Sequence, residues 1–331
     1  MLFLNSMIMG TLISISSYSW MGMWMGLEIN LLSMIPLFNS TKNMYSSESS
    51  LKYFLSQTMA SLILLYSIIL MLIFCEFITP MMNFTLNLML DSALLTKLGA
   101  APFHFWFPEV MEGLSWMNCL LLLTWQKIAP MMLIMNKMIN MNLLFMVIFL
   151  SLLISGLMGL NQTSLRKIMA FSSINHIAWM LSVSNHSYSV WTIYFITYSI
   201  ISLNLIWLFN MSNSFFLKQM FNLFKNNKML KLFMMMNFFS LGGLPPFIGF
   251  LPKWLVINFL INNNLFMQSF LLIIFTLITL YIYIRMMLNS LVMFSEESKI
   301  LNSNMNMFFM LFINFSSLML LIICTLIFNF I

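Results

Sequence analysis

Charged residues are scarce in this chain of 331 residues: they make up 7% of it, against about a quarter of an ordinary soluble domain. Hydrophobic residues make up 61%, and the mean hydropathy is +0.95. These values exclude a soluble globular protein. The apolar residues form runs of about 20, long enough to span a bilayer, and stretches such as 143–159 lack the alternation of β-barrel strands. The composition predicts an all-α polytopic membrane protein, a single domain over 1–331.

Cysteine and the short motifs of soluble enzymes are also scarce. Cys75, Cys119 and Cys324 lie far apart, without the spacing of an iron–sulfur cluster or a disulfide framework. The chain has no glycine-rich nucleotide loop, GxSxG elbow or HExxH motif. Electron carriers are therefore expected elsewhere, and no cofactor or metal is expected in this chain. The net charge of +6 is spread over short loops, so it gives no reason to expect nucleic-acid binding.

Hydropathy over a window of about 19 residues divides the chain into candidate membrane spans. Eleven are predicted, at 2–18, 20–38, 53–74, 85–107, 114–134, 142–160, 168–185, 190–210, 229–262, 266–288 and 307–330.

Two of these spans are predicted to be broken helices. The ninth is too long for one straight crossing and contains three glycines and three prolines between Gly242 and Pro252. The fourth is interrupted at Ala100-Ala101-Pro102. Proline removes a helical hydrogen bond, so the freed backbone groups need protein or water partners. Broken helices inside a membrane often mark a transport pathway, although a simple kink is the commoner explanation.

The loop charges predict how the chain is oriented. Numbered in order, the odd loops contain only Lys137, and the even loops contain Lys42, Lys52, Arg166, Lys167, Lys218, Lys225, Lys228 and Lys299. Positive residues favour the cytoplasmic side or its mitochondrial equivalent, the matrix. The even loops and the N-terminus are therefore predicted to face the cytoplasm or the matrix, and eleven spans place the C-terminus on the opposite side, which is the intermembrane space in a mitochondrion.

Four charged residues fall inside predicted spans: Glu28, Lys97, Lys127 and Lys253. Each costs about 2.5 to 3.5 kcal/mol on insertion scales unless it faces a polar interior and finds a partner. Each lysine is also close to a proline, and Lys127, three residues before Pro130, is expected beside a helix break at that proline. Lys97 is predicted in the last turn of a half-helix, whose carbonyl end stabilises a cation. A Glu–Lys pair whose separation changes can act as a proton switch. A static ion pair is the structural alternative.

Two histidines extend this set of candidate proton carriers. His104 follows Lys97 by seven residues, and a continuous helix would place both on one face. His176 has Ser172 and Ser173 one turn behind it. For both, a proton relay and a hydrogen-bonded structural role stay open. His186 is expected in a solvated loop.

Several other acids have simpler interpretations. Glu109 and Glu112 follow Pro108 at a helix start, where carboxylates suit the helix dipole. Glu76 is expected at the end of a span. Asp91 is ambiguous, because it falls within the fourth span but close to the interface.

Four segments in a fixed order carry a resemblance to a known family: 95–110, 123–130, 165–176 and 242–254. They closely resemble the chain 2 family of mitochondrial NADH-ubiquinone oxidoreductase, the antiporter-like membrane subunits of respiratory complex I. The resemblance covers nearly the whole chain, and its length and composition are similar to insect members.

The resemblance implies specific roles for these residues. Glu28 matches the family's membrane glutamate, Lys97 its partner lysine on the first broken helix, Lys127 the central lysine, and Lys253 the lysine on the second broken helix. The family translocates protons, while FMN, iron–sulfur clusters, NADH and ubiquinone bind in partner subunits. The implied location is the mitochondrial inner membrane. The implied partners are neighbouring antiporter-like and small membrane subunits of complex I, with phospholipids including cardiolipin.

Two other functions remain open at this point. A cation/proton antiporter subunit would use the same buried Glu and Lys residues. A purely structural membrane scaffold subunit would hold the charges only in static pairs.

Overall fold

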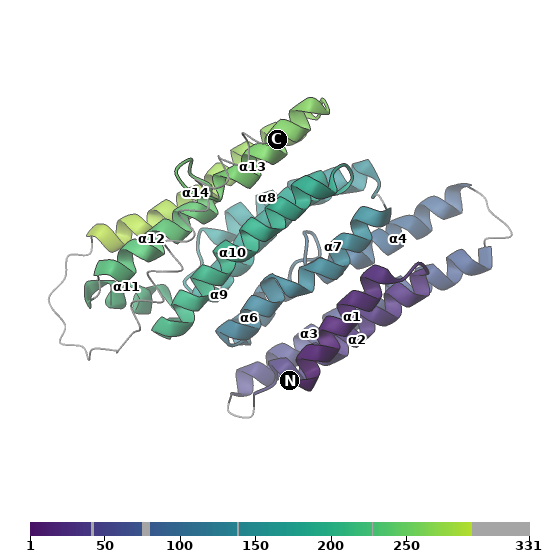
Figure 1. The fold of residues 1–331 in the computed structure, drawn as a ribbon, viewed down its shortest axis with the longest axis horizontal. Helices are drawn as coiled ribbons and strands as arrows, with labels where there is room; N and C mark the ends of the chain where they lie inside the picture. The colour runs from purple at the N-terminus through teal and green to yellow at the C-terminus, as the bar shows by residue number, and fades with distance from the viewer. Residues whose placement is uncertain (41–42, 75–79, 138, 227, 293–331) are drawn as a thin grey trace. The chain divides into compact units, whose positions relative to one another are not determined.

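The computed structural model describes residues 1–40, 43–74, 80–137, 139–226 and 228–292. Within these ranges the chain forms fourteen α-helices and one isolated β-bridge, between Ser164 and Phe216 (Figure 1). The all-α prediction is therefore confirmed for the described part. The helices form two compact units, residues 1–151 and 152–331, which divide within one helix, α8 (Met141–Gly159).

The first unit contains seven complete helices and the first half of α8. They are α1 (Leu2–Ser16), α2 (Trp20–Phe38), α3 (Met44–Phe74), α4 (Pro80–Leu98), α5 (Trp106–Gly113), α6 (Trp116–Leu123) and α7 (Trp125–Lys137). The longest, α3, packs against α2, α4 and α5, and α7 packs against α1 and α4.

Small residues let α1 and α2 approach each other closely. A Cβ atom added to Gly26 would lie 2.5 Å from the backbone nitrogen of Ser14, and one added to Gly10 would lie 2.8 Å from the backbone nitrogen of Asn30. Without a hydrophobic driving force between helices in lipid, such backbone contact supplies the van der Waals energy that holds membrane helices together. This contact fixes the helix that carries Glu28.

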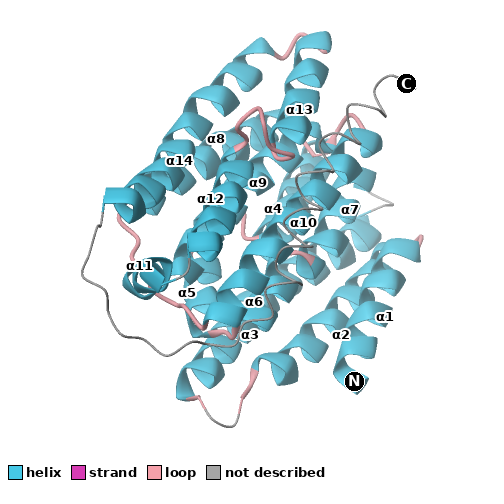
Figure 2. Cartoon of the chain, turned by 60° about the vertical axis from the view of Figure 1, so that its left-hand side comes forward, coloured by secondary structure: helices cyan, strands magenta, loops and turns pink. Residues whose placement is uncertain are grey.

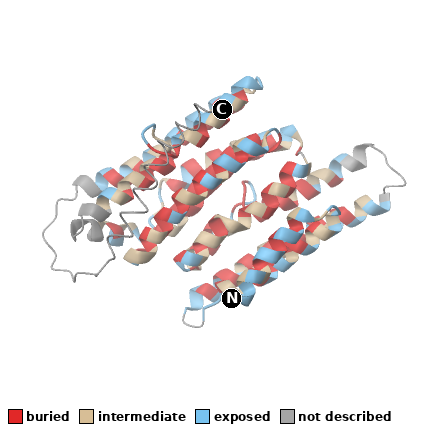
Figure 3. Cartoon of the chain, in the orientation of Figure 1, coloured by how far each residue is buried: buried red, intermediate tan, exposed pale blue. Residues whose placement is uncertain are grey.

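Helix α3 has one exposed apolar face and one buried face that carries polar groups. Large apolar residues at Leu51, Leu55 and Leu62 are about 60% exposed, while Tyr53 and Gln57 on another face are buried. Exposed and buried segments alternate in this way along the helices (Figure 3). An apolar outer face with a polar inner face fits lipid outside and packed protein inside.

Within its described residues, the second unit contains six complete helices and the second half of α8. They are α9 (Leu165–Ser184), α10 (Tyr188–Ser212), α11 (Leu217–Asn226), α12 (Lys228–Gly242), α13 (Phe250–Asn262) and α14 (Phe266–Val292). Every residue from Ile168 to Ser184 in α9 is buried, and α9 contacts α10, α13 and α14. The short helix α11 lies in a region that the sequence analysis assigned to a loop.

Both broken helices are present. The fourth predicted span becomes α4 and α5, with an interruption at residues 99–105, and the ninth becomes α12 and α13, with an interruption at residues 243–249 (Figure 2). At each break the chain leaves the helix through a left-handed glycine, Gly99 (φ 73°) or Gly243 (φ 78°). Glycine accepts this conformation at no steric cost, so it is the expected residue after a helix end.

The predicted count of eleven spans is not confirmed. Six segments of the described residues are long and apolar enough to cross a membrane, and one of them, Trp116–Lys137, joins α6 and α7. Helices α1 and α13 are apolar but shorter than a membrane span. The eleventh predicted span, 307–330, lies outside the described residues, as does Glu76. The third span begins earlier than predicted, since α3 starts at Met44, and Lys52 therefore lies on a helix and not in a loop.

Candidate functional site

Glu28 on α2 and Lys97 on α4 form an ion pair. Lys97 Nζ lies 4.0 Å from Glu28 Oε1, and their side chains are 4% and 21% exposed respectively. Lys97 occupies the last turn of α4, as predicted. The helix ends one residue later, and the Trp106 indole nitrogen donates to the Thr96 carbonyl at 3.0 Å, which closes the break around this lysine.

Lys127 lies in the first turn of α7 and is 2% exposed. The prediction that Pro130 breaks this span was wrong. The interruption is at Thr124, whose hydroxyl donates back to the Leu120 carbonyl at 2.7 Å, and Pro130 sits inside α7. Proline removes one helical hydrogen bond, and α7 nevertheless continues through Pro130 to Lys137.

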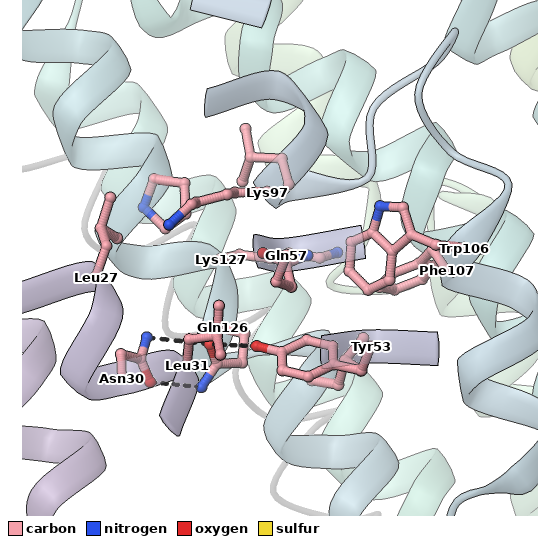
Figure 4. Close-up of a pocket in the computed structure, with 13 residues that line it drawn as sticks. Leu27, Asn30, Leu31, Tyr53, Gln57, Lys97, Trp106, Phe107, Gln126 and Lys127 are labelled. Carbon is pink, nitrogen blue, oxygen red and sulfur yellow. Dashed lines mark hydrogen bonds between the residues drawn. The ribbon is translucent and has the colours of Figure 1, made fainter. Parts of the chain in front are cut away.

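Lys97 and Lys127 both line one small internal cavity. Its volume is about 20 Å³, enough for one ordered water molecule. Figure 4 shows its lining, in which the two lysines lie among polar side chains from α2, α3 and α7. The lining residues are Leu27, Asn30, Leu31, Tyr53, Gln57, Lys97, Leu98, Trp106, Phe107, Leu122, Gln126, Lys127 and Pro130. Two lysines predicted separately therefore share one site.

Two amides, the buried Asn30 and the half-buried Gln126, hold one wall of this cavity. Asn30 Nδ2 donates to Gln126 Oε1 at 3.0 Å, and Gln126 Nε2 donates to Asn30 Oδ1 at 2.9 Å. The Tyr53 hydroxyl also approaches Gln126 Oε1, at 3.5 Å (Figure 4). The sequence analysis missed these residues, because an isolated amide in an apolar run gives no signal of its partner 96 residues away.

Lys253 occupies the corresponding break in the second unit. Its ammonium group donates to the Gly242 carbonyl at 2.8 Å and to the Leu241 carbonyl at 3.4 Å. These are among the last carbonyls of α12, which have no partner within their own helix. The ammonium group also lies 5.8 Å from the centre of the Trp179 ring. Lys253 thus stabilises the negative end of a half-helix, the arrangement predicted for Lys97.

His176 lies in a hydrogen-bonded cluster within the same unit. Its Nδ1 is 2.8 Å from the Tyr194 hydroxyl, and its ring centre is 4.9 Å from that of Tyr198. The two serines behind it bond to other tyrosines, Ser173 to Tyr198 and Ser172 to Tyr283. The polar stripe on α9 was predicted. The tyrosines on α10 and α14 were not, because tyrosine is common in apolar spans.

His104 lies in the interruption between α4 and α5. It is 3% exposed, and its Nδ1 is 3.3 Å from the Pro102 carbonyl. The helix is not continuous between Lys97 and His104, so the shared face is not formed, and His104 is not among the residues that line the cavity. His186 is exposed in a loop, as expected.

Two further ion pairs lie in the first unit. On the surface, Lys52 Nζ lies 3.0 Å from Glu48 and 3.1 Å from Glu109, and all three side chains are exposed. Deep in the unit, Lys137 Nζ lies 2.7 Å from Asp91 Oδ1, with side chains 11% and 1% exposed. The assignment of Lys137 to a loop was wrong, since it ends α7 and its side chain turns inward.

Among the described residues, no group of three or more His, Cys, Asp or Glu side chains could hold a metal ion.

These features define a class of protein: an antiporter-like membrane protein with buried lysines at its broken helices. The sequence profile of a family described as NADH:quinone oxidoreductase/Mrp antiporter, transmembrane, matches residues 17–280. A relative from Aedes aegypti named NADH-ubiquinone oxidoreductase chain 2 is 53% identical over 99% of this chain and 97% of its own. A relative of the same name from Anopheles gambiae is 51% identical over 92% of this chain and 90% of its own.

A solved structure shares the fold. The structure described as respiratory complex I from Thermus thermophilus with bound aureothin contains a chain that matches with a TM-score of 0.83 at 22% identity, over 96% of this chain and 77% of that chain. The protein therefore belongs to the NADH:quinone oxidoreductase/Mrp antiporter family and, within it, to the NADH-ubiquinone oxidoreductase chain 2 proteins. The two relatives come from insects, as the composition predicted.

Proposed function

We propose that this chain translocates protons as a core membrane subunit of NADH:ubiquinone oxidoreductase, respiratory complex I. The observation that supports this most is the cavity between Lys97 and Lys127, together with the Glu28 carboxylate 4.0 Å from Lys97. Two buried lysines beside a space for water and a loosely held acid form a site that can bind and release protons.

The geometry suggests how the switch works. A charged lysine away from bulk water loses solvation, and a nearby carboxylate offsets that loss. At 4.0 Å the Glu28–Lys97 contact is longer than a direct hydrogen bond. A movement of Glu28 toward Lys97 favours the charged lysine, and a movement away favours release of its proton. Water in the cavity can then carry the proton to Lys127.

The second unit carries a comparable set of groups. Lys253 is held by the end of α12, and His176 is bonded to a tyrosine that can donate or accept a proton. We assign proton binding to six residues in total: Glu28, Lys97, His104, Lys127, His176 and Lys253. His104 has the weakest support, because it bonds to its own loop and lies outside the cavity lining.

The setting of this activity follows from the family. The chain is proposed to lie in the mitochondrial inner membrane with its N-terminus in the matrix and its C-terminus in the intermembrane space. FMN, iron–sulfur clusters, NADH and ubiquinone are proposed to bind in partner subunits. Its neighbours are proposed to be antiporter-like and small membrane subunits, with cardiolipin among the bound lipids.

The proposal is tested by replacing Lys127 with methionine in the assembled complex. Methionine keeps most of the side-chain length and removes the charge, so the cavity keeps its shape. The complex is reconstituted in liposomes, and NADH oxidation by ubiquinone and proton uptake are measured together, with assembly checked on native gels. We expect normal assembly with loss of proton uptake and slower NADH oxidation.

A matched control is Lys218→Met, which removes an exposed lysine from α11. This variant should pump and oxidise NADH at the rate of the unaltered complex. Unchanged pumping in Lys127→Met would make the buried charges structural and support the scaffold function. Cation exchange by the chain without associated NADH oxidation would instead support a separate antiporter.

A further inference from the structure

The buried ion pair between Asp91 on α4 and Lys137 on α7 has no role in the site described above. Lys137 Nζ donates to Asp91 Oδ1 at 2.7 Å and to the Asn87 carbonyl at 2.9 Å. The Asp91 carboxylate also accepts a hydrogen bond from the backbone of Asn140. Asp91 and the neighbouring Leu90 are buried, and the Lys137 side chain is 11% exposed, so the carboxylate is shielded from solvent and the ammonium group nearly so.

Such a pair is a costly way to hold two helices together. Each ion loses several kcal/mol of solvation on burial, roughly as much as their attraction returns, and well-packed apolar residues of similar volume often give equal or greater stability. A residue of this kind within a membrane segment is therefore a functional candidate.

The pair lies on the same two helices as the lysine cavity. Asp91 precedes Lys97 by six residues on α4, about 9 Å along the helix, and Lys137 follows Lys127 by ten residues on α7, about 15 Å. The two helices run in opposite directions at this contact, so both displacements lead away from the cavity toward the same membrane face. The Asp91–Lys137 pair therefore lies nearer to that membrane face than Lys97 and Lys127 do.

An open cavity lies beside the pair. It has a volume of about 480 Å³ and is lined by Phe84, Leu88, Asn140, Met141, Asn142, Leu143 and Met146, all within the first unit. It opens to the outside through exposed apolar side chains such as Phe84 and Met146, and Asn140 and Asn142 are the polar groups in its lining that can hold water. Because Asn140 both lines this cavity and bonds to Asp91, the carboxylate is one residue away from the space.

We propose that Asp91 is a proton acceptor between the lysine cavity and the aqueous phase at the C-terminal end of α7, with Lys137 balancing its charge. The residues between the two sites along α4 and α7 include the apolar, buried Leu94 and Ile134. Proton transfer across them requires transient water, so this apolar layer separates the two sites when it is dry. The inference rests on the proposed function, since it adds a second proton-binding site, nearer the membrane face, to the same pathway.

The test compares a neutral double variant with Lys127→Met in the complete complex. Asp91→Leu with Lys137→Met removes both charges at once and leaves no unpaired buried ion. We expect this variant to assemble normally and to lose proton uptake. The control is Glu48→Gln, which weakens an exposed ion pair in the same unit and should leave pumping unchanged.

Each outcome separates this inference from the proposed function. If the double variant pumps normally while Lys127→Met does not, the pair is a structural link and the inference is overturned, whereas the proposed function stands. If Lys127→Met also pumps normally, both are overturned. If the double variant does not assemble, two single variants decide. Asp91→Asn keeps the side-chain shape and one acceptor oxygen for Lys137 but cannot take up a proton, and Asp91→Glu keeps the carboxylate. Pumping by the Glu variant alone supports the inference, and pumping by the Asn variant overturns it.

Discussion

Gly243 allows a sharp test of how the second broken helix holds Lys253. Its φ of 78° is in the left-handed region, and a Cβ atom at this position would lie 2.8 Å from Lys253 Cδ and 3.0 Å from Lys253 Nζ. Gly243→Ala therefore has two effects. It strains the backbone by about 1 to 2 kcal/mol, and it pushes the end of the Lys253 side chain away from the Gly242 carbonyl, where a charged hydrogen bond is worth about 1.5 to 3 kcal/mol.

The two effects are expected in different measurements. The contacted atoms belong to the flexible end of a lysine, so the side chain can move and the complex should still assemble, with thermal stability lowered by the backbone strain. Proton uptake should fall further, because the ammonium group has left its position at the end of α12. Asn264→Ala is the matched control, since Asn264 also has a positive φ (59°), is exposed, and lies in a loop outside the proposed site.

A double-variant cycle identifies the cause. If displacement of Lys253 explains the lost pumping, Gly243→Ala should have no further effect on pumping in a complex that already carries Lys253→Met. Equal losses of stability in Gly243→Ala and Asn264→Ala, with unchanged pumping in both, would refute the reasoning and show that the contact with the Gly242 carbonyl is dispensable.

Two more predictions follow from buried hydrogen bonds. Asn30→Leu should destabilise the complex by about 1 to 3 kcal/mol, because it leaves the half-buried Gln126 amide without its Asn30 partner. Adding Gln126→Leu should recover part of the loss, and a loss equal to the sum of both single variants in thermal melts would contradict the reciprocal bonding. Tyr194→Phe removes the hydroxyl bonded to His176 and should slow proton uptake while assembly on native gels is normal. Tyr281→Phe, which removes an exposed hydroxyl, should have no effect, and equal rates in the two variants would argue against a relay through His176.

The sequence predicted those features whose causes are local. Apolar runs of bilayer length predicted membrane helices, and the glycines and prolines at 99–102 and 242–252 predicted two breaks that the structure contains. Each depends on backbone chemistry within a few residues, so no knowledge of packing was needed. The position of Lys97 in the last turn of α4 followed from the same reasoning, because the break ends the helix one residue later.

Local reasoning was insufficient where neighbouring signals compete. Pro130 was expected to break a helix, but α7 continues through it to Lys137, with one helical hydrogen bond lost. Lys137 was assigned to a loop by its charge, yet it ends α7 and turns toward Asp91. A buried acid on a helix 46 residues earlier in the chain offsets the cost that hydropathy assigns to this lysine.

Long-range pairs were decided by tertiary packing alone. The sequence by itself determined the class of the protein, its broken helices and the identity of its buried charges. The pairing of the charges depends on helices that are adjacent in space and distant in sequence. The same is true of the contact between Asn30 and Gln126 and of the cavity that Lys97 and Lys127 share. Helix periodicity gives the face of each residue, and only the packing of one helix against another determines what that face contacts.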